Sequence, residues 1–405
     1  MTALDDPGAP ANPQGAASRP PGAAAEVVRA TIATACQGLV QREALVELVA
    51  LCAVAGEHLL VIGPPGTAKS EAVRRIARGL GGTYFEYLIG RFTEPTEIFG
   101  PIDLRRLREG VVETETAGML PEAELAFLDE IFLGSTAILN TLLGVLNERT
   151  FRRGHTQLRC PLRVCVGASN ALPDDEQLAA FADRFLVRTF VEPIADTGLE
   201  ELLSAGWALG GAAAPGAPGA SAASLTHIDA LAAAALTMEL GAIRGTLAHA
   251  IRLLRGAGIE LSDRRIVRLQ RLVAAAAALA GRDSPGAADL WPIIYALPTQ
   301  HAQRLGRDVL RELLASSHNP ALLAAAAEGS LGARARGARI LRDATALLDA
   351  APARDAAGEL DAWHLRLEGM AREIDATFAA ESLPPELAQV RARIVALLRP
   401  EADAT

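Results

Sequence analysis

The chain has few of the residues that mark secreted, membrane or zinc-binding proteins. Its 405 residues include only 4 cysteines, and their spacing matches no zinc-site pattern. Cys160 and Cys165 border an apolar run typical of a strand, so we expect buried thiols in a reducing compartment. No apolar run is long enough to span a bilayer, and the chain does not open on a charged segment followed by an apolar one. These absences predict a cytoplasmic protein.

Aromatic residues and net positive charge are also scarce. Aromatics make up 4% of the chain, whereas hydrophobic residues make up 50%, and the abundance of alanine favours helices. The formal net charge is -9, so no overall field attracts nucleic acid or an anionic membrane. We therefore expect no nucleic-acid partner. A chain of this length has room for two or three domains.

A phosphate-binding loop is the strongest motif that is present. The apolar run 58–62 ends in Gly63-Pro64-Pro65-Gly66-Thr67-Ala68-Lys69-Ser70, and a helical pattern follows. Backbone N–H groups at a helix N-terminus can hold a phosphate chain. Lys69 would reach the β- and γ-phosphates of ATP, and the Ser70 hydroxyl would bind Mg²⁺. The strict pattern has Gly in place of Ala68, so a Gly/Pro turn before a surface helix is the alternative for this motif alone.

Two further apolar runs end in polar residues. Residues 125–128 are followed by Asp129 and Glu130, and residues 162–168 lead to Asn170. Open α/β sheets place their ligands at the carboxyl ends of such strands. Asp129 would bind Mg²⁺, Glu130 would activate the attacking water, and Asn170 would hydrogen-bond that water or the γ-phosphate. Without the loop upstream, these residues would be read as strand ends and a loop cap.

Arg184 lies in the segment 181–185 and suits an arginine finger that completes the site of a neighbouring subunit. Arg188 would follow it by one helical turn. An ordinary surface arginine is the alternative for Arg184.

Arg264 and Arg265 fall in the first turn of a helix that Ser262 begins. A cation there opposes the helix dipole, which suggests a nearby anion, although simple surface arginines also fit. A further arginine cluster between residues 149 and 163 fits a solvated loop or a subunit contact.

Composition and periodicity divide the chain into five parts. We expect a disordered tail (1–24), a nucleotide-binding domain (25–195), a linker (196–224), an all-helical lid (225–300) and a helical extension (301–405). Within the nucleotide-binding domain, residues 90–118 are expected to form an inserted hairpin. In the extension, apolar residues at spacings of three and four between 360 and 397 predict helices that pack on each other.

In their order and identity the motifs closely resemble those of MoxR-type AAA+ ATPases, and within them the RavA-like branch of the helix-2-insert clade. The resemblance covers roughly residues 35 to 300, and its matching residues are Gly63–Ser70, 85–88, 99–101, 118–124, 127–131, 137–143, 147–149, 168–170, 172–173, 183–184, 262–265 and 281–283. It implies an α/β fold, an AAA+ αβα sandwich with a parallel sheet, followed by an all-α lid and a helical extension. Ala68 is common in that branch.

The resemblance also assigns roles to residues. It implies Gly63 to Ser70 as Walker A, Asp129 and Glu130 as Walker B, Asn170 as sensor 1, Arg184 as the arginine finger and Arg264 as sensor 2. Arg265 competes with Arg264 for the last role. Residues 90–118 would be the helix-2 insert, and residues 148–157 a hairpin before sensor 1.

The expected function is Mg²⁺-dependent ATP hydrolysis by a hexameric ring that remodels or matures a protein partner in a chaperone-like way. Such ATPases often work with a protein carrying a von Willebrand factor A domain. ATP would bind between the αβα domain and the lid, with Arg184 supplied by the neighbouring subunit.

Two alternatives remain from the sequence. The first is a nucleic-acid-directed motor, supported only by the arginine cluster 149–163. The second is a nucleotide-dependent switch without hydrolysis, against which the presence of both Asp129 and Glu130 argues.

Overall fold

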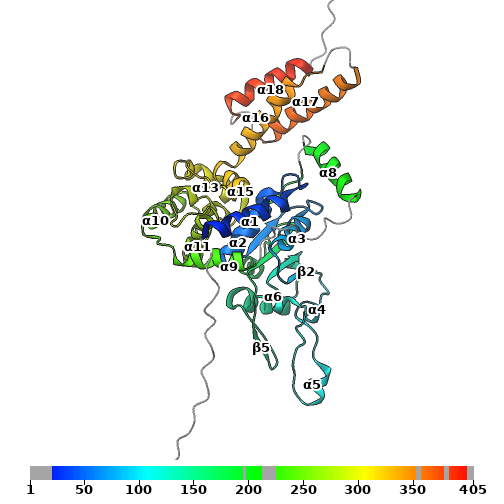
Figure 1. Ribbon diagram of the computed structural model, residues 1–405, viewed down its shortest axis with the longest axis vertical. Helices are drawn as coiled ribbons and strands as arrows, with labels where there is room; N and C mark the ends of the chain where they lie inside the picture. The colour runs from blue at the N-terminus through cyan, green and yellow to red at the C-terminus, as the bar shows by residue number, and fades with distance from the viewer. Residues whose placement is uncertain (1–20, 195–197, 212–224, 353–356, 378–382, 399–405) are drawn as a thin grey trace, which may run out of the picture.

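A five-stranded parallel sheet forms the centre of the computed structural model, which describes residues 21–194, 198–211, 225–352, 357–377 and 383–398 (Figure 1). Its strands, in spatial order, are β2 (Tyr84–Leu88), β3 (Leu125–Asp129), β6 (Val164–Ser169), β1 (Leu59–Ile62) and β7 (Val187–Phe190). All pairs are parallel. The sheet therefore has an amino edge, where every strand begins, and a carboxyl edge, where every strand ends.

Helices cover both faces of this sheet. Leu59 and Val61 point to the core beneath α1 (Pro21–Cys36), α2 (Glu43–Ala55) and α3 (Lys69–Leu80). Leu60 and Ile62 point to a second core that includes α6 (Thr136–Leu143) and the end of α7 (Glu176–Ala182). A strand buried on both faces must be apolar throughout, as β1 is. The expected αβα sandwich with a parallel sheet is confirmed.

Strand β7 is an element that the sequence did not predict. Arg188 lies within it, so it does not follow Arg184 by one helical turn as expected. The strand has only four residues, and one of them is charged, which leaves little pattern to detect. Its pairing with β1 holds Leu60 opposite Arg188 in register.

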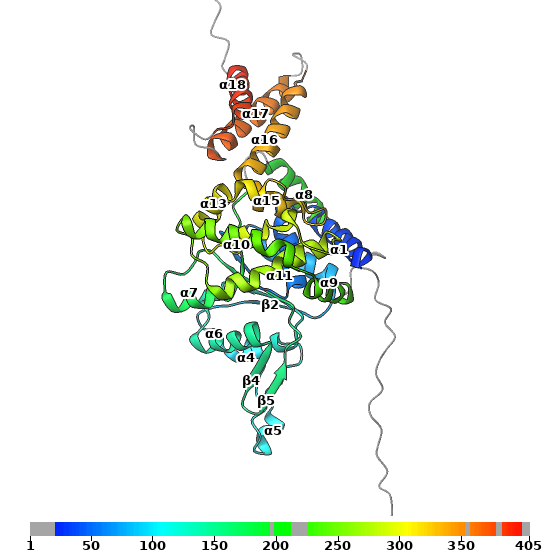
Figure 2. The same cartoon turned by 90° about the vertical axis from the view of Figure 1, so that its left-hand side faces the viewer.

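The insert 90–118 contains more helix than the predicted hairpin. It includes α4 (Pro95–Phe99) and, at its tip, α5 (Leu104–Arg108), while an isolated antiparallel bridge joins Ile102 to Thr114. The hairpin of β4 (Thr150–Arg153) and β5 (Thr156–Arg159) packs beside it, and the two segments project together from the body (Figure 2). We call this projection the arm.

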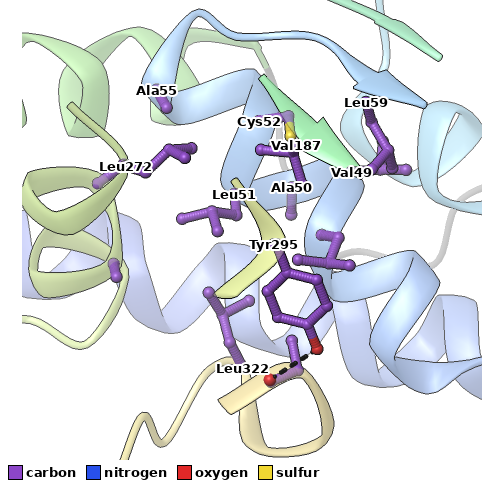
Figure 3. Packing of buried hydrophobic residues seen from close by; sticks show 14 of the residues in the cluster. Val49, Ala50, Leu51, Cys52, Ala55, Leu59, Val187, Leu272, Tyr295 and Leu322 are labelled. Carbon is purple, nitrogen blue, oxygen red and sulfur yellow. Dashed lines mark hydrogen bonds between the residues drawn. The ribbon is translucent and has the colours of Figure 1, made fainter. Parts of the chain in front are cut away.

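The helices between residues 225 and 331 share one core with α1 and α2. They are α9 (Leu225–Thr237), α10 (Gly241–Gly256), α11 (Asp263–Leu279), α12 (Pro292–Tyr295), α13 (Gln300–Val309), α14 (Arg311–Leu314) and α15 (Leu323–Leu331). Figure 3 shows Tyr295 and Leu322 near Leu51 of α2, and the Tyr295 hydroxyl donates to the Ala325 carbonyl at 2.9 Å. The expected lid boundary at residue 300 thus crosses a continuous core.

Three further helices form a separate bundle at the end of the molecule opposite the arm (Figure 1). They are α16 (Ala333–Asp349), α17 (Ala357–Thr377) and α18 (Pro385–Leu398), and they enclose their own apolar cluster with Leu367 and Ile374 at its centre. The prediction that these helices pack on each other is confirmed, with α16 as a third member.

Two of the expected boundaries also differ. Helix α1 begins at Pro21, inside the predicted tail, and residues 1–20 lie outside the described residues. Helix α8 (Leu199–Gly211) occupies part of the predicted linker, whose residues 212–224 also lie outside them. Within the described part of the chain no single helix is long and apolar enough to cross a membrane; α9 and α10 reach that length and apolarity only as a pair bent by 84°.

Candidate functional site

The phosphate-binding loop begins where β1 ends at the carboxyl edge. The Gly63 N–H donates to the Ser169 carbonyl of β6 at 3.0 Å. A Cβ on Gly63 would lie 2.3 Å from the carbonyl oxygen of Val191, just after β7. Only glycine fits at this position, because the backbone of the loop passes against the end of the neighbouring strand.

Ala68 adopts the conformation that explains why glycine is usual there. Its φ of 58° and ψ of 25° are left-handed, and α3 begins at the next residue. For a residue with a Cβ this conformation costs about 1 kcal/mol. Within the described residues, the N–H groups of Gly66 and Ala68 donate no hydrogen bond. The loop therefore presents unpaired donors at a helix N-terminus, which fits a phosphate chain.

The Lys69 ammonium lies inside this loop. It donates to the carbonyls of Gly63 at 2.7 Å and Pro64 at 2.9 Å. Burial lowers the pKa of Lys69, and the carboxylates of Asp129 and Glu130 oppose that shift. The ammonium thus lies against the loop, within electrostatic range of Asp129 at the end of β3 and of Glu130 just after it.

Glu130 and Asn170 meet at the same edge because β3 and β6 are adjacent. The Asn170 amide donates to a Glu130 carboxylate oxygen at 2.7 Å. Glu130 has a left-handed φ of 51°, and its N–H donates to the Asp129 carboxylate at 3.0 Å. The structure therefore brings together Lys69, Asp129, Glu130 and Asn170, and their roles stay predictions.

The oxygen donors at this edge fit Mg²⁺ only in combination with phosphates. No group of three or more His, Cys, Asp or Glu side chains among the described residues could hold a metal ion alone. The Ser70 hydroxyl and the Asp129 carboxylate are hard oxygen ligands, and Mg²⁺ commonly takes one or two carboxylates together with substrate phosphates.

Arg42 is a residue of this site that the sequence reasoning missed. Its Nε donates to the Thr67 carbonyl at 2.8 Å, and its Nη2 donates to the Glu192 carbonyl at 2.9 Å. Arg42 precedes α2 and is 5% exposed. It joins the phosphate-binding loop to the chain after β7 by hydrogen bonds, and no local sequence motif predicts this role.

Arg184 lies at the opposite edge of the sheet. It belongs to the connection from α7 to the beginning of β7. The amino edge lies one strand length from the loop: Glu57 precedes Gly63 by six residues, or about 20 Å of extended chain. The Nε of Arg184 is buried and has no hydrogen-bond partner among the described residues. Arg184 therefore cannot serve the phosphate-binding loop of its own chain.

Arg264 also lies at the amino edge, which corrects its expected place beside the ATP of its own chain. Its Nη2 donates to the side chain of Asn147. Burial lowers the pKa of Arg264, and the like charges of Arg184 and Arg268 lower it further. The N-terminus of α11 packs against the start of β1 rather than its end, because Arg268 forms an ion pair with Glu57.

Arg265 points into the protein instead. It is 3% exposed, and it contacts Asp183 at 3.0 Å and backbone carbonyls of the chain before β7. Of the two candidates for sensor 2, Arg264 is the one that faces the surface.

A pocket of about 370 Å³ opens beside Arg184. Its lining comprises Asn140, Thr141, Leu143, Gly144, Asn147, Glu148, Thr150, Arg152 and Arg184. Asn147 and Glu148 lie in the π-helical turn η3 (Gly144–Glu148) that follows α6. The amino edge thus carries gathered guanidinium groups next to an open polar pocket, an arrangement that suits an anion from outside the chain.

Three arginines of the cluster 149–163 form contacts within the fold, whereas Arg152 and Arg159 are exposed. Arg149 donates to the Gly56 carbonyl at 2.8 Å, and Arg153 donates to the Gly100 carbonyl at 3.1 Å. Arg163 forms ion pairs with Glu124 at 2.9 Å and Asp229 at 2.8 Å. These contacts join elements of the fold, so the cluster gives little support to a nucleic-acid interface.

Burial disfavours the reactive thiolate form of the cysteines. Burial raises the pKa of Cys165 to about 12 and that of Cys160 to about 11, and all four side chains are free of disulfides.

Comparisons with known proteins agree with this geometry. A family model described as "MoxR domain in the MoxR-vWA-beta-propeller ternary systems" matches residues 26–230, just over half of the chain. Two uncharacterized proteins of Methanocaldococcus jannaschii are 42% identical over 155 residues, which is 38% of this chain and 42% and 41% of theirs. A protein named chaperone MoxR1, from Mycobacterium tuberculosis, is 30% identical over 154 residues, 37% of this chain and 40% of its own. The match thus spans about two fifths of these relatives.

A solved structure shares the fold. The crystal structure of a candidate ATPase from Cytophaga hutchinsonii superposes with a TM-score of 0.56 at 15% identity, covering 73% of this chain and 97% of that one.

Proposed function

The chain belongs to the MoxR domain family of the MoxR-vWA-beta-propeller ternary systems, and we propose that it hydrolyses ATP at sites completed between subunits. One observation carries the proposal. Lys69 and the hydrogen-bonded pair of Glu130 and Asn170 meet at the carboxyl edge, while Arg184, whose Nε has no hydrogen-bond partner among the described residues, lies at the amino edge. A hydrolytic site needs both groups, and one chain cannot bring them together.

The residues of the carboxyl edge divide the chemical work. The N–H groups of residues 66–68 and the Lys69 ammonium would bind the phosphates, and Ser70 and Asp129 would hold Mg²⁺. Mg²⁺ neutralises charge on the β- and γ-phosphates when it is bound. Glu130 accepts a proton from the attacking water, and the Asn170 amide fixes the orientation of its carboxylate.

Opposite edges of one sheet favour head-to-tail assembly. The amino edge of one subunit would face the carboxyl edge of the next, and such a heterologous contact closes into a ring when the rotation allows it. The resemblance to the RavA-like branch supports a hexamer. Arg184, together with Arg264, would then act on the ATP of the neighbour, which also accounts for the gathered like charges.

The family description supports a partner with a von Willebrand factor A domain, because it names such systems. The relative named as a chaperone supports chaperone-like remodelling or maturation of a protein. The helical bundle α16–α18, which has its own core, would be available for docking that partner. We expect this work to take place in the cytoplasm.

Substitutions at the carboxyl edge test the hydrolytic site. Lys69→Ala should abolish ATP binding, measured by calorimetry, and an unchanged affinity would refute the assignment of the loop. Glu130→Gln should bind ATP but lose turnover by about 10²- to 10⁴-fold, because the general base is gone. Turnover near the wild-type rate would remove Glu130 from that role, and absence of turnover in the wild type under assembly conditions would favour the switch without hydrolysis.

Mixing subunits tests the division of the site. Arg184→Ala and Lys69→Ala subunits are each expected to be inactive alone. In a mixture, the Lys69→Ala subunit can lend its intact Arg184 to an intact phosphate-binding loop, so activity should return. If it does not return although the variants co-assemble, Arg184 does not act across an interface.

A further inference from the structure

The chain around Arg184 is held by two arginines of α11. The Arg265 guanidinium contacts the Asp183 carboxylate at 3.0 Å, the Phe185 carbonyl at 3.3 Å and the Leu186 carbonyl at 3.1 Å. It also donates to the Ala296 carbonyl at 3.2 Å. One buried side chain thus fixes the residues on both sides of Arg184.

Arg268 fixes Arg184 itself. Its Nη1 donates to the Arg184 carbonyl at 3.3 Å, while its Nε and Nη2 face both oxygens of Glu57, with Nε at 3.0 Å. The Glu57 side chain is fully buried, at 0% exposure. A buried bidentate pair leaves a guanidinium little freedom, so the third bond of Arg268 sets the position of the Arg184 backbone relative to the start of β1.

The side chain of Arg184 shows the opposite condition. Its Nε is buried without a partner among the described residues. The backbone of Arg184 is bonded at both ends: its N–H donates to the Phe181 carbonyl, and its carbonyl accepts from Arg268. A guanidinium whose backbone is fixed and whose Nε has no partner among the described residues is not committed to the fold, so it can bind an incoming anion through its terminal nitrogens. Displacement by about 1 Å can reduce the rate of a reaction about 100-fold, so this restraint has consequences for turnover.

We propose that Arg265 and Arg268 are positioning residues, which hold Arg184 at the angle and depth needed to reach the ATP of the neighbouring subunit. The inference rests on the proposed function, in which Arg184 acts across an interface. It assigns a role to the lid helix α11 that differs from covering the nucleotide of its own chain. The two arginines act through Arg184 and touch no nucleotide themselves.

Kinetic constants separate this role from a general structural one. Arg268→Lys keeps the charge but cannot hold Glu57 and the Arg184 carbonyl together, and Asp183→Asn weakens the grip of Arg265 at a partly exposed side chain. Both variants should lower kcat about 10- to 100-fold. The KM for ATP should stay within about twofold, because the phosphate-binding loop lies at the other edge of the sheet.

Arg271→Lys is the matched control. Arg271 lies on the same helix, is exposed, and donates no hydrogen bond within the described residues. Its kcat should equal that of the wild type. A rise in KM with kcat unchanged in Arg268→Lys and Asp183→Asn, or an equal loss in Arg271→Lys, would overturn the proposal.

Mixing the variant subunits then shows which half of the divided site is defective. Arg268→Lys subunits are mixed with Lys69→Ala subunits, and Arg184→Ala with Lys69→Ala serves as the reference. Random mixing of equal amounts gives the productive arrangement at about one interface in four, so about a quarter of wild-type turnover per subunit should return. Thermal melting and size-exclusion chromatography of each variant verify folding and assembly.

The two mixtures distinguish failure of the positioning role from failure of the divided site. If the Arg184→Ala mixture recovers and the Arg268→Lys mixture does not, the defect lies in the mutated subunit's own loop and the positioning role is wrong. If neither mixture recovers, the divided site fails and the inference fails with it. If Arg268→Lys does not fold, Asp183→Asn carries both tests.

Discussion

At the scale of single residues, Ala68 departs from the usual loop without a change in backbone shape. It keeps the left-handed conformation at φ 58° that glycine adopts freely. The strain of about 1 kcal/mol is partly offset, because alanine also restricts the unfolded chain. The departure is therefore a small local cost rather than a different loop.

We predict that Ala68→Gly changes the free energy of unfolding by less than about 1 kcal/mol and leaves ATP affinity unchanged, because relief of strain and added chain entropy oppose each other. Chemical denaturation and calorimetry measure the two quantities. A loss of binding would mean that the Ala68 methyl group itself contacts the ligand.

Lys69 is the only lysine in the chain, whereas arginine supplies the other basic side chains. An amine-reactive reagent can therefore modify only Lys69 and the amino terminus. We predict that ATP with Mg²⁺ protects Lys69 from acylation. Peptide mass spectrometry measures the extent of labelling. The amino terminus serves as the internal control, and equal labelling of Lys69 with and without ATP would contradict its place in the site.

The predicted site residues that the structure brings together follow a strand directly, as Glu130 and Asn170 do, or follow the loop after a strand, as Lys69 does. Lys69, Glu130 and Asn170 come together because parallel strands end at one edge, and that rule needs no knowledge of distant contacts. Arg264 depended on where α11 packs, which the buried pair of Arg268 and Glu57 decides across more than two hundred residues of chain. Local sequence patterns do not predict a contact between residues so far apart in the chain.

At the scale of elements, the side-chain carboxyl group of Glu47 in α2 caps the N-terminus of α15. The Glu47 side chain accepts from the N–H of Ala325 at 2.6 Å and of Ala324 at 3.3 Å. These are first-turn donors of a helix whose own cap residue offers no side-chain bond. Burial raises the pKa of Glu47 to about 8, with smaller contributions from Glu43 and Glu328, although the two hydrogen bonds oppose the shift.

The raised pKa predicts how stability depends on pH. Between about 4.5 and 8 the folded chain binds a proton at Glu47 that the unfolded chain has lost, so this group's stabilising contribution is full below pH 4.5 and disappears as the pH rises to about 8. We predict that the wild type loses up to about 1.4 kcal/mol per pH unit more than Glu47→Gln across this range. Urea unfolding at pH 5.5 and 7.5 measures the difference, and parallel pH profiles would refute it.

The sequence predicted long elements better than short ones. Helix α11 has a Ser262 cap and an apolar face over many turns, and the structure has it as expected. Strand β7 and helices α4 and α5 have four or five residues each, so no periodicity can develop within them. Their conformation comes from neighbours, such as the pairing of β7 with β1.

At the scale of the whole molecule, the two halves of the proposed site lie at opposite edges of one sheet. Turnover per subunit should therefore fall on dilution, since separated chains have no complete site. We predict this loss in a concentration series of the wild type. A constant turnover per subunit down to concentrations at which sedimentation shows monomers would contradict the divided site.

The separate cores predict the effect of truncation. The main cluster includes no residue beyond Ala326, and the bundle α16–α18 has its own cluster. A chain that ends at Gly332 should keep the main melting temperature within about 2 °C, because the ion pair of Glu200 with Arg366 is exposed and contributes little. Differential scanning calorimetry measures this. Collapse of the main transition would show that the body depends on the bundle.

The continuous core between the sheet and the lid has a mechanical consequence. Helices α9 to α15 share buried side chains with α2, and α11 is also tied to the amino edge by Arg265 and Arg268. Such a body resists bending between its parts, as a rigid link does in a machine. Any movement driven by the nucleotide would then be a displacement of one subunit relative to the next. The length of β1, which separates the two edges of the sheet, would set the distance over which that displacement is transmitted.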